Sequence, residues 1–337
     1  MLFCDTLRSG LRRIRPRGCL VVLITGGMGF IGLHTARAFL DADEDVVITR
    51  FASWREPSFI KDEYGKRVIV ETLDTTSPFD CIELVRRHKV DSIVHLAVPG
   101  LGALSVAEDI RVNIMGLLNV LEAARLNDVK RVSVGSSTPL YSGLSSGPFP
   151  EDVLMPLHGD SYSSTFKKTQ EILAKHYSDR TGIEVRTLRI SGIWGPVYHS
   201  GANLPSRMVH GALRGGTVDL SGAFGGVPFE DDNTDLCYGS DCGRCIQSIH
   251  MAPAVTPFRA YNVGSGVATA NVELRHAVLK AIPGVQIPLR AGQGPNYRPN
   301  ACLDLTRTTT ETGYRPQFDV ERGVADYVAW LKAGNRF

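Results

Sequence analysis

The sequence lacks any run of about 18 apolar residues, so it predicts no membrane-spanning helix. The net charge is also close to zero, because 37 Lys and Arg are nearly balanced by 35 Asp and Glu. This balance argues against nucleic-acid binding by the globular part. No internal repeat or low-complexity tract is present. Seven cysteines, an odd number in a long chain, do not suit a disulfide framework and predict reduced thiols in the cytoplasm. At 337 residues, 43% of them hydrophobic, the chain is long enough for one or two folded domains.

The unbalanced charge lies at the N-terminus, where residues 1–18 contain one acid, Asp5, and five arginines: Arg8, Arg12, Arg13, Arg15 and Arg17. The apolar residues 19–24 follow, so this segment superficially looks like a secretory signal. The apolar run is too short for that, and no small-residue cleavage site precedes a plausible mature start. Cleavage would also remove the first expected strand. We therefore interpret residues 1–18 as a disordered extension or an overlong start of the reading frame.

Three cysteines, Cys237, Cys242 and Cys245, are spaced as C-x4-C-x2-C, with Cys302 far downstream. This spacing matches the ligands of a plant-type iron–sulfur cluster. The surroundings lack the glycine-rich ligand loop of such clusters, and residues 238–246 also fit the start of a helix. We therefore expect buried thiols and no metal.

The segment from Val21 to Gly32, VVLITGGMGFIG, predicts a buried strand, a glycine-rich turn and the start of a helix. Its glycines Gly26, Gly29 and Gly32 match the T-G-x-x-G-x-x-G form of the dinucleotide-binding turn. The first permits a tight turn, the second lets a pyrophosphate approach the backbone, and the third lets the helix pack closely on the strand. Because the helix N-terminus offers free N–H groups and a partial positive charge, the segment predicts a bound dinucleotide.

Apolar strand-like segments alternate with helical periodicity in the first part of the chain. Strands are expected at residues 45–49, 68–70, 92–97, 131–134 and 185–190. Helical patterns occupy residues 81–88, 109–126 and 164–180 between them. This alternation predicts an α/β fold, a Rossmann-like doubly wound parallel sheet covered on both faces. From Gly195 onward glycine and proline are frequent, which indicates a smaller, irregular C-terminal part where a substrate would be recognised.

Nine segments in register resemble the extended short-chain dehydrogenase/reductase superfamily and, within it, the nucleotide-sugar epimerase/dehydratase family. They are TGGMGFIG (25–32), Leu73-Asp74, residues 93–97, Asn113 in VNIMGLLNVLEAA, Ser136-Ser137 with Leu140-Tyr141, LRISGIWGP (188–196), YGSDCGRCI (238–246), YNVGSG (261–266) and LDLTRT…TGYRP (303–316). The resemblance extends over about residues 20–331. It implies a dinucleotide-binding domain of residues 19–195 plus 235–264. A substrate-binding domain would comprise residues 196–234 plus 265–331.

The resemblance also implies roles for individual residues. Ser137 would hydrogen-bond the reacting oxygen, and Arg298 would face the diphosphate of a nucleotide substrate. His95 and Arg189 lie in segments that are structural in the family. The residues expected to contact the cofactor are Gly26, Gly29, Phe30, Ile31, Gly32, Arg50, Asp74, Leu96, Ala97, Asn113 and Lys167.

The family's chemistry uses a tyrosine as acid/base and a lysine four residues later on the same helix, and this pair is displaced here. Lys167 takes the lysine position, Ser163 stands where tyrosine is expected, and Tyr162 is one residue early. Five residues apart on a helix, Tyr162 and Lys167 point about 140° apart. Three interpretations stay open. The helix starts only near Ser164, capped by Ser161 or Ser163, and Tyr162 swings into the site. Alternatively, Tyr141 or His158 transfers the proton, or the protein binds cofactor without turnover.

The form of the cofactor depends on the end of the second strand. NAD-dependent relatives carry an acid there for the adenosine ribose, whereas this chain has Arg50, with Arg55 shortly after. A guanidinium cannot accept hydrogen bonds from the ribose but suits a 2′-phosphate. The chain is therefore expected to bind NAD or NADP, with NADP favoured, although a solvent-exposed Arg50 beside an NAD pocket is also consistent.

Together these features predict a cytoplasmic NAD(P)-dependent oxidoreductase of the epimerase/dehydratase type that acts by hydride transfer on a nucleotide sugar or similar polyhydroxylated substrate. Ser137, Tyr162 and Lys167 would be its catalytic residues. An NADPH-dependent carbonyl reductase and a non-catalytic cofactor-binding protein are the alternatives. By resemblance, a homodimer is expected through a four-helix bundle of the helix at 164–180 and the one containing Asn113.

Overall fold

The computed structural model describes residues 20–52, 54–99, 104–157, 161–198, 201–223 and 226–335, without the side chain of Tyr162. The expected N-terminal extension, residues 1–18, lies outside these residues. No helix in these ranges combines the length and the apolar character that crossing a membrane requires.

The described residues form one large parallel sheet of seven strands in the order β3-β2-β1-β4-β5-β6-β9. The strands are rich in β-branched residues, and those of β1 are buried throughout, as a sheet covered on both faces requires. Their bounds are β1 Val21–Thr25, β2 Asp45–Arg50, β3 Val68–Thr72, β4 Ser92–His95, β5 Arg131–Ser137, β6 Glu184–Ile190 and β9 Phe258–Val263. The predicted Rossmann-like doubly wound sheet is confirmed.

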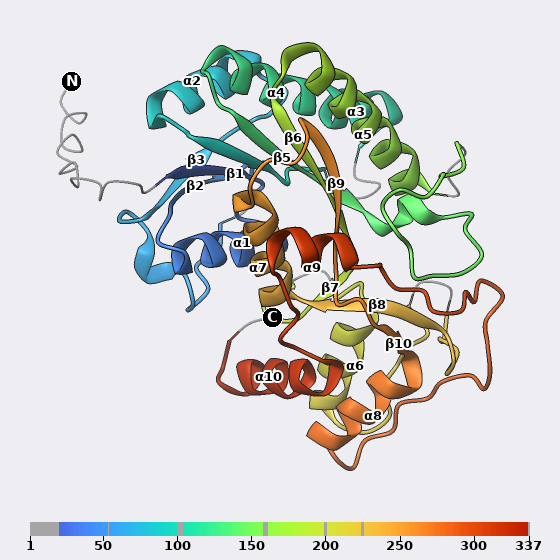
Figure 1. Cartoon of the computed structure of the whole chain (residues 1–337). Coiled ribbons are helices and arrows are strands. Elements are labelled where there is room, and N and C mark those ends of the chain that lie inside the picture. Colours follow the sequence, from blue (N-terminus) through green and yellow to red (C-terminus); the bar gives the residue numbers. More distant parts are fainter. Residues whose placement is uncertain are drawn as a thin grey trace.

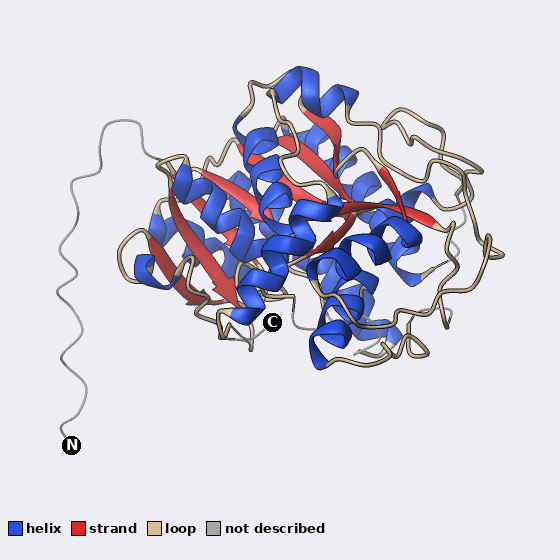
Figure 2. Ribbon diagram, turned by 90° about the horizontal axis from the view of Figure 1, so that it is seen from below, coloured by secondary structure: helices blue, strands red, loops and turns tan. Residues whose placement is uncertain are grey.

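Helices cover both faces of this sheet, as Figure 1 and Figure 2 show from two directions. Helices α2, α4 and α5 lie on one face, and α1 and α7 lie on the other. The bounds along the sheet are α1 Phe30–Asp41, α2 Pro78–His88, α3 Val106–Ile110, a π-helical turn Arg111–Met115, α4 Gly116–Leu126, α5 Tyr162–Thr181, α7 Gly239–Met251 and α9 Thr306–Thr312, with 3₁₀ turns Lys61–Glu63 and Thr138–Tyr141.

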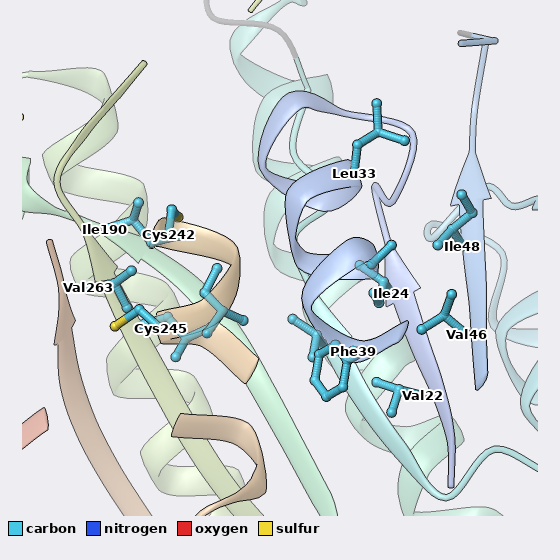
Figure 3. Close-up of a cluster of buried hydrophobic side chains, with 14 of the residues drawn as sticks. Val22, Ile24, Leu33, Phe39, Val46, Ile48, Ile190, Cys242, Cys245 and Val263 are labelled. Atoms are coloured by element: carbon cyan, nitrogen blue, oxygen red, sulfur yellow. The ribbon is translucent and has the colours of Figure 1, made fainter. Parts of the chain in front are cut away.

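The core between the sheet and α1 and α7 is drawn in Figure 3. Val22 and Ile24 of β1 and Phe39 of α1 contact one another in this core. Cys242 and Cys245 extend from the neighbouring helix α7 into the same core. Burial raises the pKa of these two thiols and of Cys237. Among the described residues no group of three or more histidine, cysteine or acidic side chains could hold a metal ion. These cysteines therefore act as small apolar core residues.

The C-terminal part packs below the sheet in Figure 1 around its own apolar cluster. A three-stranded sheet in the order β10-β8-β7 joins it to the rest of the molecule. Its elements are β7 Gly192–Trp194, α6 Leu204–Arg214, β8 Asn233–Tyr238, β10 Ala268–Ala270, α8 Asn271–Ala281 and α10 Val320–Lys332. The residue boundaries expected for the two domains stay a prediction.

The strand order positions the site. β1 pairs with β2 on one side and with β4 on the other, so the chain reverses direction across the sheet between β1 and β4. In doubly wound folds the ligand lies outside the carboxyl ends of the strands at such a switch point. The segments that leave β1, β4 and β5 at their carboxyl ends, including the glycine-rich turn, therefore lie where a ligand would bind.

Candidate active site

The glycine-rich turn after β1 has the backbone that each predicted glycine requires. Gly26 has a φ of +66°, which favours glycine, and its carbonyl accepts a 2.9 Å hydrogen bond from the Gly29 N–H. A Cβ on Gly32 would stand 2.5 Å from the Gly26 oxygen, so any side chain there would separate helix from turn. α1 begins at Phe30 with neither a side-chain cap nor an acid in its first turn. Its first N–H groups therefore remain available for an anion.

The segment that follows β4 lies against this turn. A Cβ on Gly26 would come 2.8 Å from the backbone nitrogen of Ala97, and the Leu96 N–H donates to the Thr25 carbonyl at 3.1 Å. The Thr25 hydroxyl accepts from the Ala97 N–H at 3.3 Å and lies 2.7 Å from His95 Nδ1. Burial lowers the pKa of His95 to about 3, so the ring is neutral and joins the ends of β1 and β4. The structure thus brings Leu96 and Ala97 to the glycine-rich turn.

Lys167 extends from α5 to the same end of the sheet. Its ammonium donates to the Gly135 carbonyl on β5 at 2.8 Å and to Gln170 Oε1 at 3.0 Å. Burial lowers its pKa to about 8, although the charge of Glu171 acts in the opposite direction. Lys167 is close enough to His95 for its charge to contribute to the low pKa of that ring. Since an ammonium has three N–H donors, one is left without a partner among the described residues.

Gln170 connects Lys167 to the π-helical turn between α3 and α4. While its side-chain oxygen accepts from Lys167, its amide nitrogen donates to the backbone carbonyl of Asn113 at 3.1 Å. A π turn leaves a carbonyl outside the regular helical pattern, and such turns occur frequently at functional sites. The Asn113 side chain donates to the Asp109 carbonyl at 2.9 Å and so supports the turn. The predicted cofactor residues Asn113 and Lys167 are therefore brought together through Gln170.

α5 begins earlier than one of our interpretations assumed. Ser161 is the N-cap, accepting from the Ser164 N–H at 3.2 Å, and Tyr162 is the first helical residue. The expectation of a helix that starts only near Ser164 is therefore wrong, while Ser161 as the cap is confirmed. On this continuous helix Ser163, not Tyr162, shares a face with Lys167. The Tyr162 side chain lies outside the described residues.

Of the other acid/base candidates, Tyr141 is occupied in a buried network. Its hydroxyl donates to Asn262 Oδ1 at 2.8 Å and accepts from Arg189 Nη1 at 2.9 Å. Burial raises the pKa of Tyr141 to about 12. Arg189 also forms a buried ion pair with Glu171 at 2.8 Å, which agrees with the structural role expected of Arg189. His158, the remaining candidate, lies outside the described residues.

The predicted substrate residues come from distant parts of the sequence to the end of β5. Ser137 is the last residue of β5 and is partly exposed. Arg298 donates to the Tyr141 carbonyl at 3.0 Å, only four residues beyond Ser137, and its guanidinium lies 4.8 Å from the centre of the Phe149 ring. Among the described residues no carboxylate forms an ion pair with this half-buried guanidinium. Its charge is therefore available for an anionic ligand.

The residues expected around the adenosine lie at the ends of β2 and β3. Arg50 ends β2, and its guanidinium stacks 5.4 Å from the centre of the Trp54 ring. Both line a cavity of about 430 Å³ between β3 and α2. Asp74 follows β3, and one of its carboxylate oxygens accepts from the N–H and the hydroxyl of Thr76 at 2.9 and 2.8 Å. The second oxygen of Asp74 has no hydrogen bond within the described part of the chain.

Residues 22–264 match the model of a family described as the NAD dependent epimerase/dehydratase family. The chain belongs to this family. The family predicted from the sequence, with its NAD-dependent enzymes, is therefore confirmed.

Proteins of known sequence or structure are similar to almost the whole chain. An uncharacterized protein of Methanocaldococcus jannaschii is 30% identical, over 92% of this chain and 95% of its own length. A dTDP-glucose 4,6-dehydratase of Streptomyces antibioticus is 26% identical, over 92% of each chain. The crystal structure of a dTDP-glucose 4,6-dehydratase from Bacillus anthracis in complex with NAD superposes with a TM-score of 0.77. It covers 94% of this chain and 98% of its own at 19% identity, which supports the same fold.

Two features of this epimerase/dehydratase site were missed by reasoning from the sequence. The bridge formed by Gln170 could have been suspected, because Gln170 is three residues from Lys167 and shares its helix face. No sequence signal marks the contact between Arg55 and the glycine-rich turn, where Arg55 Nη1 donates to the Met28 carbonyl at 3.2 Å. It depends on the path of an irregular loop.

Proposed function

We propose that the chain is an NAD(P)-dependent oxidoreductase of the epimerase/dehydratase type that acts on a nucleotide sugar. The observation that carries this proposal is the position of Lys167, a partly buried ammonium beside the His95–Ala97 segment with one N–H donor left over. A ribose hydroxyl of a dinucleotide lying on the glycine-rich turn is a suitable acceptor for that donor. Bound nicotinamide supplies the chemistry of accepting a hydride from a substrate carbon and returning it.

The chain's own residues bind the cofactor and the substrate and transfer the proton. Ser137 holds the reacting oxygen by a hydrogen bond, and Lys167 binds the ribose and favours deprotonation of a nearby acid through its charge. Tyr162 is our proposed acid/base. In the continuous helix α5, Tyr162 stands five residues before Lys167 instead of four, and this spacing favours one alternative, a protein that binds the cofactor without turnover. Arg298, with no acidic partner in the described residues, binds the diphosphate of the substrate.

Cofactor and substrate classes are proposed from the relatives and from single side chains. The family that matches the chain is described as NAD dependent, and the similar Bacillus anthracis dehydratase was crystallised in complex with NAD. Arg50 at the end of β2 supports a preference for NADP over NAD. Since a relative is a dTDP-glucose dehydratase, a hexose joined to a nucleoside diphosphate is our substrate class.

Incubation with nucleotide sugars tests the proposal. We expect dTDP-glucose or a UDP-hexose to reduce bound cofactor transiently, with absorbance at 340 nm, and to yield an epimer or a 4-keto-6-deoxy sugar. Ser137→Ala should lower this turnover by about 10²-fold or more, because the hydroxyl that hydrogen-bonds the reacting oxygen in the transition state is lost. Product without any cofactor reduction contradicts the proposed hydride transfer. No product from any nucleotide sugar, while simple ketones oxidise NADPH, contradicts the proposed substrate class and favours the carbonyl reductase.

We further propose a cytoplasmic homodimer. Five described cysteines are buried and unpaired, as reduced thiols in the cytoplasm are. Large apolar side chains are exposed along the helices expected to form the bundle: Val106, Ile110, Met115 and Ile172. A dimer buries such a surface. The mass in solution by analytical ultracentrifugation, for the wild type and Ile172→Glu, checks this expectation: a dimer for the first and a monomer for the second.

A further inference from the structure

The side chain of Gln170 is fixed at both ends. Its amide oxygen accepts from the Lys167 ammonium at 3.0 Å, and its amide nitrogen donates to the Asn113 carbonyl at 3.1 Å. Reversing the amide would place N–H groups against the ammonium and an oxygen against the carbonyl, so both hydrogen bonds would be lost. Gln170 is also only 2% exposed, which leaves its amide little access to water. Its two neighbours therefore select one orientation of this side chain.

Gln170 also fixes the orientation of the Lys167 ammonium. The Gly135 carbonyl on β5 accepts one of the three N–H groups of this ammonium at 2.8 Å. Held by a single acceptor, an ammonium at the end of a flexible four-carbon stem can pivot about that hydrogen bond. The oxygen of Gln170 is the second acceptor, and it stops the pivot. The direction of the third N–H, which we assign to a ribose, thus depends on Gln170.

The second acceptor of Lys167 is neutral. Glu171, the next residue after Gln170, is committed to an ion pair with Arg189 at 2.8 Å. No carboxylate in the described part of the chain forms an ion pair with Lys167. Burial lowers the pKa of Lys167 to about 8, although the charge of Glu171 acts in the opposite direction. An amide at position 170 therefore orients the ammonium without neutralising it, and the charge stays available for a ligand.

The other end of Gln170 joins α5 to the π-helical turn Arg111–Met115. Its partner there is the backbone carbonyl of Asn113, which cannot rotate away as a side chain could. The orientation of the amide is therefore tied to the backbone of that turn. We propose that Gln170 is a positioning residue that directs the remaining N–H of Lys167 to the ribose next to the nicotinamide and so controls how tightly the nicotinamide half of the dinucleotide is held. This inference rests on the proposed function, because it requires a dinucleotide on the glycine-rich turn.

NAD and ADP test this role, because both carry adenosine diphosphate and only NAD has the second ribose. Titration calorimetry gives the ratio of the two Kd values, ADP over NAD, for each variant. Gln170→Met keeps the unbranched shape without either hydrogen bond. It should lower the ratio at least about fivefold and leave Kd for ADP within about twofold of the wild type.

Two further variants support this comparison. Gln170→Asn keeps a buried amide but is one methylene too short to span both partners, so it should lower the ratio in the same way, and it decides the question if Gln170→Met does not fold. Gln247→Met is the matched control, since Gln247 lies on α7 and its side-chain oxygen accepts from Ser248 Oγ at 3.5 Å. This control should leave the ratio unchanged.

A double-variant cycle shows whether Gln170 acts through Lys167. Lys167→Met alone should lower the ratio by at least as much as Gln170→Met. Adding Gln170→Met to Lys167→Met should then change the ratio by less than about twofold, because the group that Gln170 positions is already gone. A role of Gln170 that is independent of Lys167 predicts instead a further loss of about fivefold in the double variant.

The outcomes separate this inference from the proposed function. A wild-type ratio in the folded Gln170 variants, or a further fivefold loss in the double variant, overturns the positioning role while the proposed function stands. A loss of ADP affinity in Gln170→Met as large as its loss of NAD affinity also overturns the positioning role, because the effect then is not confined to the nicotinamide half. Failure of the wild type to bind either NAD or ADP overturns the proposed function and this inference with it.

Discussion

Replacing Lys167 by methionine should lower kcat by about 10²- to 10⁴-fold, the range in which a positioned proton-transfer system contributes. Methionine keeps the unbranched shape but removes the charge and the N–H that we assign to the ribose. The substitution also leaves the Gly135 carbonyl and Gln170 Oε1 without their donor. The measurement is steady-state turnover of the nucleotide sugar identified by the assay proposed above, with Kd for the cofactor measured separately.

Lys175→Met is the control, because Lys175 lies on the same helix but pairs with Asp179 at an exposed position. It should keep kcat within about twofold. The wild-type rate should also fall as pH rises through about 8, because burial lowers the pKa of Lys167 to that value and the ammonium is the active form. Turnover by Lys167→Met within about threefold of the wild type would contradict the role that we assign to this residue.

As the pH is lowered, the protein should begin to lose stability near pH 6.5, well above the pH range in which carboxylates titrate. Burial lowers the pKa of His34 to about 4 and the pKa of both His95 and His250 to about 3, from an ordinary 6.5. On unfolding below pH 6.5 each ring takes up a proton that it does not bind in the folded state. Stability is therefore full above 6.5 and falls as pH drops, by about 4 kcal/mol in total between pH 7 and 5.5 for three such rings.

Urea unfolding at pH 7, 6.25 and 5.5 measures this loss. His250 lies 2.8 Å from each of two serine hydroxyls, those of Ser92 and Ser133, so it joins β4 to β5 as a neutral ring. His250→Gln should lower stability at pH 7 and reduce the slope with pH by about a third, because one of three titrating rings is gone. His276→Gln, at an exposed position, should leave the slope unchanged. A wild-type stability that is flat between pH 7 and 5.5 would contradict the neutral buried rings.

The fold could be predicted from local patterns because those patterns report burial. Strand β1 is buried at each position and apolar from Val21 to Ile24. The spacing of Gly26, Gly29 and Gly32 corresponds to one backbone path with close helix packing. The prediction of one helix over residues 109–126 was less accurate. A π turn at Arg111–Met115 interrupts it, and apolar periodicity cannot distinguish one extra residue per turn within a continuous helix.

The candidate site was predictable only where its residues lie on regular elements. Lys167 and Ser137 follow from their helix and strand, but the start of α5 at Tyr162 depends on capping by Ser161, which competed with two other serines nearby. The approach of Arg298 to the Tyr141 carbonyl spans 157 residues through irregular chain. Tertiary packing decides such contacts, and neither propensity nor spacing reports it.

The central claim is that a nicotinamide dinucleotide binds on the turn between β1 and α1. Thermal unfolding of the full chain with increasing NAD and NADP tests it most directly, because a ligand that binds the folded state alone stabilises by about 2.7 kcal/mol at one hundred times its Kd. We predict a midpoint that rises with concentration for both dinucleotides, and further for NADP. A midpoint unchanged by millimolar amounts of either would contradict the account.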